Sequence, residues 1–352
     1  MSPQYGVVGC LTLDNVIAHD GERYARVAGG NVLYTALGVT VWSPSVGIVS
    51  RAGSDYPQRT LAALADIGVD VGGVTVRDGP HEFNVAFAYS PNGDRTRTVS
   101  PQLLATLPAD ERRFYHDTTS DEVLRLDYAP DPADIPPSWL PDTLGWHLAS
   151  LPRTKQASLA QALRDSAPSG TVTTADGVDA KDLGPETALS DFGYVSTLDA
   201  LLPSEADLTI PGLGEPFQRI SALRSLGVPT VAMKFGPRGS VVTTDLGSWH
   251  VPVAAVEAVD PTGAGDAYCG GFLVGYTETR DPVEAAVYGT VAASYIVEAV
   301  GPVLNLSVER DDAQARAAAV RARVRRIEHD PVAAFGRPPR TNREGTRCSR
   351  LA

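Results

Sequence analysis

The chain has 352 residues, of which 43% are hydrophobic and 20% charged, and its formal net charge is -12. This composition excludes a disordered chain, and the length is enough for one large domain or two small ones with a sizeable core. The acidic balance argues against a broad nucleic-acid-binding surface. No apolar run approaches the roughly 18 residues that a membrane-spanning helix needs. We therefore expect neither a nucleic acid nor a membrane as partner.

The start of the chain predicts a cytoplasmic protein. Residues Met1 to Cys10 contain no basic stretch followed by a long apolar run, as a secretory signal would. The cysteines are Cys10, Cys269 and Cys348, an odd number that are far apart and have no metal-binding spacing. This pattern favours a reducing compartment.

Short β-rich segments alternate with helical patterns along most of the chain. Alternation of this kind predicts βαβ crossovers and a mostly parallel sheet that is covered by helices on both faces. The expected class is α/β, with a doubly wound sheet. The predicted strands are Tyr5 to Cys10, Val46 to Ser50, Gly145 to Ala149, Thr171 to Thr174, Gly193 to Thr197 and Pro229 to Lys234, and the predicted helices are Pro57 to Ile67, Arg153 to Ser166 and Glu215 to Leu226.

Two segments interrupt this alternation. Residues 11–27 and 71–99 are rich in Val, Thr and Phe and contain turn signals such as Pro91-Asn92-Gly93-Asp94. They are typical of hairpins that project from a main sheet. We expect them to form a small β-sheet lid.

The composition changes at Arg310, so we divide the chain into a domain of residues 1–309 and a C-terminal segment of residues 310–352. Eleven of the 30 basic residues lie between Arg310 and Arg350. The pattern predicts an Ala/Arg helix from Ala313 to Ile327, followed by a Pro/Arg/Gly tail. Two interpretations are open: a basic tail for an acidic partner, or a surface helix with a disordered end.

The strongest chemical signal lies between Val259 and Tyr276. Gly263, Ala264 and Gly265 have little or no side chain, so the backbone can turn tightly and present N–H groups at the start of an apolar helix. Such a helix start binds anions. Asp266 follows directly and can accept a proton from an attacking hydroxyl while the amides stabilise a transferred phosphoryl group.

Other nucleotide and catalytic motifs are missing from the sequence. A dinucleotide fingerprint would need glycine where Tyr268 stands, and a Walker A loop needs Gly-Lys, whereas the three lysines follow Thr154, Ala180 and Met233. The six histidines have no zinc-binding spacing, and no serine lies in Gly-x-Ser-x-Gly. An ordinary helix N-terminus remains the alternative for the tripeptide alone.

The segment Asp260-Pro-Thr-Gly-Ala-Gly-Asp-Ala-Tyr-Cys-Gly-Gly-Phe-Leu resembles the C-terminal signature of the ribokinase-like (PfkB) family of ATP-dependent sugar and nucleoside kinases. The resemblance covers roughly residues 5 to 302. It implies that Asp266 is the catalytic base and that the backbone of Gly263, Ala264 and Gly265 forms the anion hole. It also implies a β-sheet lid, in agreement with the two hairpin segments.

Two N-terminal segments resemble the acceptor-binding motifs of the same family. Gly9 to Asp14 is similar to the first strand, and Ala28-Gly-Gly-Asn31 is similar to the di-glycine substrate loop. The implied substrate-binding residues are Asp14, Gly29, Gly30 and Asn31. Asp14 and Asn31 offer polar groups for vicinal hydroxyls, and the glycines allow close approach of the backbone. For Gly53-Ser-Asp55, a structural role and a substrate contact are both open.

The segment Met233 to Ser240 resembles the strand and turn that hold the nucleotide. The implied ATP-binding residues are Lys234, Gly236 and Gly239, together with Thr262. Lys234 is also plausible as a solvent-capped strand end. Asp260 and Thr262, with the loop that ends at Gly301, occupy places where some relatives bind a monovalent cation such as K⁺.

One motif departs from the family pattern. Where the family has Asn-x-x-Glu, this chain has Ser204-Glu-Ala-Asp207. Aspartate is one methylene shorter than glutamate, so we expect Asp207 to contact Mg²⁺ through water rather than directly. A capped helix start is the alternative interpretation.

These features predict an ATP- and Mg²⁺-dependent phosphotransferase whose acceptor is a hydroxyl of a small sugar or polyol. A nucleoside kinase of the same family and a non-catalytic ligand-binding or regulatory protein are the alternatives. The family resemblance also allows a homodimer.

Overall fold

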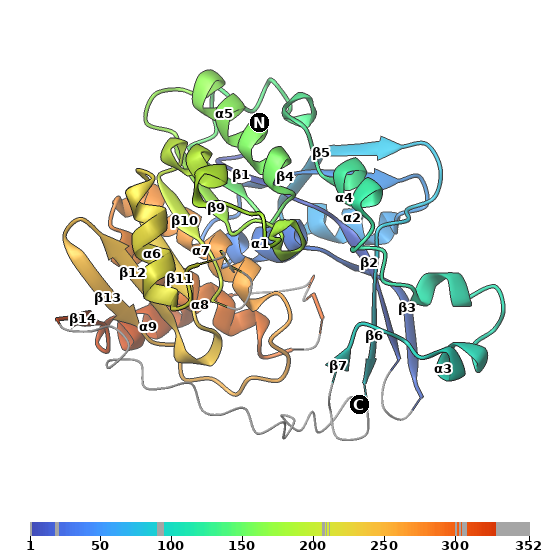
Figure 1. The fold of residues 1–352 in the computed structure, drawn as a ribbon. Coiled ribbons are helices and arrows are strands. Elements are labelled where there is room, and N and C mark those ends of the chain that lie inside the picture. Colours follow the sequence, from blue (N-terminus) through green and yellow to red (C-terminus); the bar gives the residue numbers. More distant parts are fainter. Residues whose placement is uncertain are drawn as a thin grey trace.

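The computed structural model describes residues 2–17, 21–89, 95–205, 208, 210, 212–299, 301–302, 304 and 308–328. These residues form a ten-stranded main sheet and a four-stranded second sheet that stands apart from it (Figure 1). The predicted α/β class, with a doubly wound, mostly parallel sheet and a small lid, is confirmed. Among these residues, no helix has both the length and the apolar character required to cross a membrane.

The main sheet has the order β14-β13-β12-β11-β10-β9-β8-β1-β4-β5. Strands β5 to β11 of this order are parallel, and the three at the other edge are antiparallel. The bounds are β1 Tyr5–Val8, β4 Val46–Gly53, β5 Val69–Arg77, β8 Gly145–Leu148, β9 Val172–Asp176, β10 Ala200–Leu202, β11 Val231–Lys234, β12 Ser240–Thr244, β13 Gly247–Val251 and β14 Arg325–Ile327.

Strand β1 marks the point where the strand order reverses. It pairs with β4 on one side and with β8 on the other, and all four of its residues are buried. In open α/β sheets, ligands bind beyond the carboxyl ends of the strands at such a point. The carboxyl end of β1 leads into Gly9 and the lid, so the topology places the predicted acceptor motifs at this edge.

The lid has the strand order β3-β2-β6-β7. Its strands are β2 Thr12–Ile17, β3 Arg23–Gly29, β6 Asn84–Tyr89 and β7 Arg95–Thr96. The prediction that residues 71–77 belong to the lid is wrong, because they continue β5 in the main sheet and pair with β4. Backbone pairing with a buried parallel strand outweighs their Val/Thr-rich lid-like pattern.

Helices cover both faces of the main sheet. Adjacent residues of β1 show this directly, because Val7 belongs to one hydrophobic cluster and Val8 to the other. The α-helices are α1 Asn31–Thr40, α2 Gln58–Asp66, α3 Pro101–Ala105, α4 Glu122–Tyr128, α5 Arg153–Ser166, α6 Pro216–Ser225, α7 Ala264–Thr279, α8 Pro282–Ile296 and α9 Arg310–Arg321, and the 3-10 helices are Arg112–Tyr115, Pro132–Asp134, Ala180–Asp182, Leu189–Thr197 and Gly236–Arg238.

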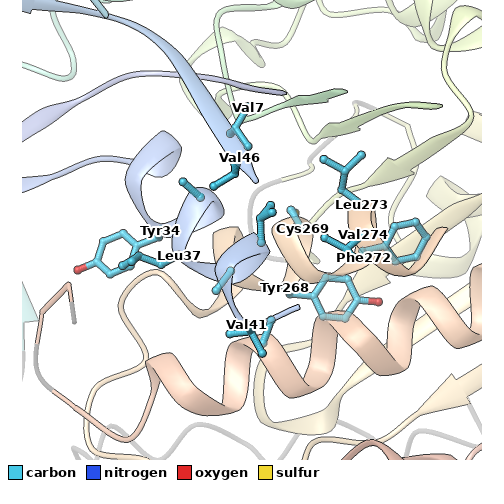
Figure 2. Close-up of a cluster of buried hydrophobic side chains, with 14 of the residues drawn as sticks. Val7, Tyr34, Leu37, Val41, Val46, Tyr268, Cys269, Phe272, Leu273 and Val274 are labelled. Carbon is cyan, nitrogen blue, oxygen red and sulfur yellow. The ribbon is translucent and has the colours of Figure 1, made fainter. Parts of the chain in front are cut away.

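Helices α1 and α7 pack unusually closely. A Cβ atom on Gly38 would lie 2.2 Å from the carbonyl oxygen of Ala267, and one on Gly270 would lie 2.1 Å from that of Thr35. Side chains of the two helices, including Leu37 and Cys269, meet in the buried cluster of Figure 2. This packing fixes the start of α7 beside the start of α1.

Two predicted elements differ from the structure. Gly193 to Thr197 is part of a 3-10 helix, not a strand, because Phe192 and Val195 are buried at a spacing of three. The strand of this region is β10, which follows it. The predicted helix over 313–327 ends at Arg321, and β14 then pairs with the exposed edge of β13.

Candidate active site

Helix α7 begins where the glycine motif predicted a helix start. Gly263 has φ of +76°, a left-handed conformation that glycine adopts without strain. Its carbonyl accepts the first helical hydrogen bond, from the amide of Ala267 at 2.9 Å, and the amide of Ala264 donates to the carbonyl of Pro261 at 3.2 Å. The remaining first-turn amides have no acceptor within the helix, so this end of α7 suits an anion.

Asp266 lies in the first turn of α7 and is half-buried. A carboxylate at this place benefits from the positive end of the helix dipole. The side chain follows directly after the backbone of Gly263, Ala264 and Gly265. The predicted base and anion hole are therefore brought together within one helical turn.

Asp260 organises the loop before α7. Its two carboxylate oxygens accept hydrogen bonds from the amide of Thr262 at 2.9 Å and from that of Gly301 at 3.4 Å. The amide of Val259 donates to the carbonyl of Val297 at 2.7 Å. The loop before α7 and the chain after α8 are thus adjacent, as the cation hypothesis requires.

The predicted acceptor residues lie around the end of β1. A Cβ atom on Gly29 would lie 2.5 Å from the Asp14 carboxylate, so only glycine lets this carboxylate lie against the backbone. Asp14 accepts a hydrogen bond from the Thr12 hydroxyl at 2.8 Å. Gly30 has φ of +111°, and a Cβ atom there would lie 2.2 Å from the carbonyl oxygen of Cys10.

Asn31 joins three elements and has part of its polar capacity occupied. Its Oδ1 accepts from the amide of Cys10 at 2.9 Å, and its Nδ2 donates to the carbonyl of Ser150 at 2.6 Å. A carboxamide has two lone pairs and two N–H donors, so one of each is left for a ligand. Asn31 therefore fixes the ends of β1 and β8 as well as the start of α1.

The Gly53-Ser-Asp55 turn makes structural contacts. The Asp55 carboxylate accepts from the amide of His81 at 2.6 Å and forms an ion pair with Arg26 of the lid at 2.8 Å. His81 Nδ1 accepts from the amide of Gly53 at 3.1 Å, and burial lowers the pKa of this histidine to about 4. The turn thus ties the lid to the main sheet.

The Lys234 side chain points to Asp176 and to helix α7, whereas the sequence predicts an ATP contact or a solvent-capped strand end. Its Nζ lies 2.9 and 2.8 Å from the two carboxylate oxygens of Asp176, 3.2 Å from Cys269 Sγ and 3.4 Å from the carbonyl oxygen of Gly265. The side chain is 11% exposed, so it is not a solvent-capped strand end. It lies beneath the first turn of α7, between that turn and the end of β9.

The glycines after Lys234 shape the next loop. A Cβ atom on Gly239 would lie 2.2 Å from the carbonyl oxygen of Val251, whereas one on Gly236 would meet open space. Arg238 between them forms an ion pair with Glu205 and stacks on Phe235, with the guanidinium 5.2 Å from the ring centroid. Gly236 therefore leaves room for a ligand at this edge.

Asp207 lies outside the described residues, so its predicted magnesium contact stays a prediction. Ser204 forms a β-bridge with Lys234, and the amide of Glu205 donates to the Lys234 carbonyl at 2.9 Å. Within the described part of the chain, no three His, Cys, Asp or Glu side chains form a metal-binding cluster. An edge without such a cluster suits Mg²⁺ that arrives with nucleotide phosphates and keeps most of its waters, with Glu205 nearby.

A cavity of about 390 Å³ lies away from these residues. It is formed by the loop before α7, the end of α8 and α9, and includes Val256, Glu298 and Arg316. None of the predicted site residues lines it.

The structure brings three predicted segments together at the start of α7: the acceptor loop with Asn31, the strand end with Lys234 and the glycine motif itself. Tyr34, one turn after Asn31, places its ring where a Cβ atom on Gly263 would lie, and Lys234 reaches Gly265 from below. Asp176 was missed by the sequence analysis. The available signal is a carboxylate followed by glycine, and it lies just beyond the predicted strand because β9 extends two residues past Thr174.

Comparisons with known proteins identify kinases as relatives of this chain. Residues 148–308 match the sequence model of a family described as "pfkB family carbohydrate kinase". The chain is 26% identical over 295 residues to a cytidine kinase from Thermococcus kodakarensis, which covers 80% of this chain and 91% of the relative.

Two solved structures share the fold. Aminoimidazole riboside kinase from Salmonella enterica, complexed with aminoimidazole riboside and an ATP analogue, has a TM-score of 0.64 at 20% identity and covers 89% of this chain and 99% of its own. An E. coli protein provisionally assigned as Ribokinase II, in complex with ATP and Mg²⁺, has a TM-score of 0.65 at 18% identity and covers 91% of this chain and 100% of its own. Together with the order of the motifs, these findings lead to one conclusion: residues 148–308 carry a pfkB family carbohydrate kinase domain, and the chain has the fold of the two kinase structures.

Proposed function

We propose that this protein transfers the γ-phosphoryl group of ATP to a hydroxyl of a small sugar or polyol, with Asp266 as the general base. The observation that carries the proposal is the position of Asp266. Its carboxylate lies half-buried in the first turn of α7, beside amides that have no acceptor within the helix.

In the proposed step, Asp266 accepts the proton of the acceptor hydroxyl as its oxygen attacks the γ-phosphorus. The bond between that phosphorus and the bridging oxygen of ADP breaks, and ADP leaves. The backbone of Gly263, Ala264 and Gly265 lines the helix start that would face the transferred group. The Ala264 amide already donates to Pro261, so we assign charge stabilisation mainly to the amides that follow it.

The acceptor would lie between the lid and the carboxyl end of β1. Asp14, Asn31 and the backbone of Gly29 and Gly30 surround this position. Closure of the lid over the acceptor would exclude water and suppress ATP hydrolysis. The ion pair between Asp55 and Arg26 would keep the lid connected to the main sheet during this closure.

The nucleotide would lie along the loop of Gly236 and Gly239 and beside Thr262. When bound, Mg²⁺ would neutralise phosphate charge, and Glu205 is one of the described carboxylates at that edge. A water-mediated contact from Asp207, a monovalent cation beside Asp260 and a homodimer remain predictions from the family resemblance.

A nucleoside acceptor is the second candidate, favoured by the similarity to the Thermococcus kodakarensis cytidine kinase over 80% of this chain. A base needs an aromatic or apolar shelf. The aromatic side chains nearest the acceptor motifs do not favour it, because Tyr34, Phe83 and Phe87 are all at most 7% exposed. This burial supports the sugar or polyol as the first candidate.

The test is ATP consumption with a panel of sugars, polyols and nucleosides, cytidine included. We expect one acceptor class to stimulate ADP release, and Asp266→Asn to lower kcat by about 10²- to 10⁴-fold while ATP binding is kept. An Asp266→Asn variant as active as the wild type would overturn the assignment of the base. Absence of stimulation by the whole panel in a folded protein would favour a non-catalytic ligand-binding role.

A further inference from the structure

A buried ion pair lies directly beneath the proposed anion hole. Asp176 is the last residue of β9 and Lys234 the last of β11, and the two side chains meet across the end of β10 with N–O distances of 2.8 and 2.9 Å. Both side chains are 11% exposed. The pair is therefore placed at the carboxyl edge of the sheet, on the side that faces α7.

The ammonium contacts α7 at two successive turns. It lies 3.4 Å from the carbonyl oxygen of Gly265 and 3.2 Å from Cys269 Sγ, and these residues are four positions apart on one face of the helix. The Gly265 carbonyl and the Asp266 amide belong to the same planar peptide group. Because the Lys234 ammonium holds the Gly265 oxygen, it also fixes the direction of the Asp266 N–H in the same peptide group. The contact polarises this peptide group and makes its N–H a stronger hydrogen-bond donor.

Stability alone gives little reason for a lysine at this place. A cation near a helix N-terminus is opposed by the helix dipole. A buried ion pair is often no more stabilising than apolar side chains of the same volume. The same positive charge, however, favours an ionised carboxylate at Asp266.

We propose that Lys234 and Asp176 are positioning residues for phosphoryl transfer: Asp176 holds the Lys234 ammonium, which in turn fixes the peptide group between Gly265 and Asp266. The inference deepens the proposed function and rests on it. It replaces the predicted contact of Lys234 with the ATP phosphates by an action through the helix backbone.

The groups around the ammonium keep it charged. Burial lowers the pKa of Lys234, but the charges of Asp176 and Asp266 and the hydrogen bond to Asp176 outweigh it, so the net pKa is raised. On the neighbouring strand β8, burial and Lys234 lower the pKa of His147 to about 3, so this imidazole is neutral near pH 7. Burial raises the pKa of the Cys269 thiol, so it is neutral as well.

The decisive variant is the double replacement Lys234→Met with Asp176→Asn, because it removes both charges and leaves neither partner buried alone. We expect a thermal midpoint near that of the wild type and a kcat lowered about 10- to 100-fold, as for other residues that orient a reacting group from behind. KM for ATP and acceptor should change by less than about threefold.

Asp199→Asn provides the matched control. Asp199 is a partly buried carboxylate at the opposite edge of the sheet, where it accepts a hydrogen bond from the amide of Thr173 at 2.7 Å, and burial raises its pKa. This variant should leave kcat and the KM values unchanged, because Asp199 lies away from the start of α7. Hydrogen exchange of residues 262–270 gives a readout independent of turnover, and it should become faster in the double variant and stay unchanged in the control.

A double variant with wild-type kcat and wild-type hydrogen exchange in residues 262–270 would overturn the proposal and leave the pair a purely structural contact. Failure of the proposed function would look different, because Asp266→Asn would then retain the activity of the wild type. If no acceptor stimulates the wild type, the exchange measurement still decides whether the pair fixes the helix start.

Discussion

Gly263 is the residue whose conformation sets the first turn of α7. Its φ of +76° is rarely adopted by other residues, and a Cβ atom there would lie 2.2 Å from the Tyr34 ring. A substitution therefore meets both backbone strain and a clash with a ring that is 3% exposed. The start of the helix, with its amides, has to move if the side chain grows.

We expect Gly263→Ala to lower the free energy of unfolding by about 1–3 kcal/mol. The fall in kcat should be at least as large as the unfolded fraction of the variant accounts for. The measurement is a urea transition together with steady-state kinetics. Gly170→Ala is the matched control, since Gly170 also has a positive φ of +93° but nothing within 4 Å of its added Cβ. It should cost about 1 kcal/mol and leave kcat unchanged. Equal kinetics of the two variants would contradict the role given to the α7 start.

At the level of elements, the C-terminal part of the main domain depends on α9 and β14. Ala313, Ala317 and Val320 of α9 are fully buried against the hydrophobic cluster of α7 and α8. Strand β14 extends the sheet by pairing with β13, where the guanidinium of Arg326 lies 5.6 Å from the Trp249 ring centroid. The division of the chain at residue 309 thus separates elements that pack together in the structure.

A chain that ends at Val308 should lose about 2–4 kcal/mol of stability, because it exposes the α8 surface and the edge of β13. A chain that ends at Glu328 keeps α9 and β14 and serves as the control. Its urea midpoint should match that of the full chain. If the chain that ends at Val308 had the same urea midpoint as the full chain, α9 would add no stabilising contact.

For the whole molecule, two buried histidines predict how stability depends on pH. His147 is fully buried, with Nδ1 2.9 Å from the Thr174 hydroxyl, and His81 is 2% exposed. Burial lowers their pKa values from 6.5 to about 3 and about 4, respectively. Below pH 6.5 the unfolded chain binds protons that the native protein does not, so the free energy of unfolding falls as the pH falls.

Each of these histidines should lower stability by up to about 1.4 kcal/mol per pH unit between pH 6 and pH 4. Urea transitions at pH 7, 6 and 5 measure this slope. His147→Asn, which keeps a hydrogen-bonding group but does not titrate in this range, should remove about half of it. A slope in the variant as steep as in the wild type would assign the acid sensitivity to other groups.

The sequence by itself determined the α/β class, the lid and the helix start with Asp266. Each of these depends on a local pattern: alternation of strands and helices, turn signals, or a glycine motif with its family resemblance. The motif residues of α7 lie where their spacing predicted, because a helix start is specified by residues that are adjacent in the chain.

Only the tertiary structure decided what Lys234 contacts and that residues 71–77 belong to the main sheet. Asp176 and Lys234 are 58 positions apart, and they meet because β9 and β11 end at the same edge beneath α7. Likewise, the division between lid and sheet at 71–77 follows from pairing with β4. Contacts between distant segments depend on the order of strands in the sheet, which no local pattern of residues specifies.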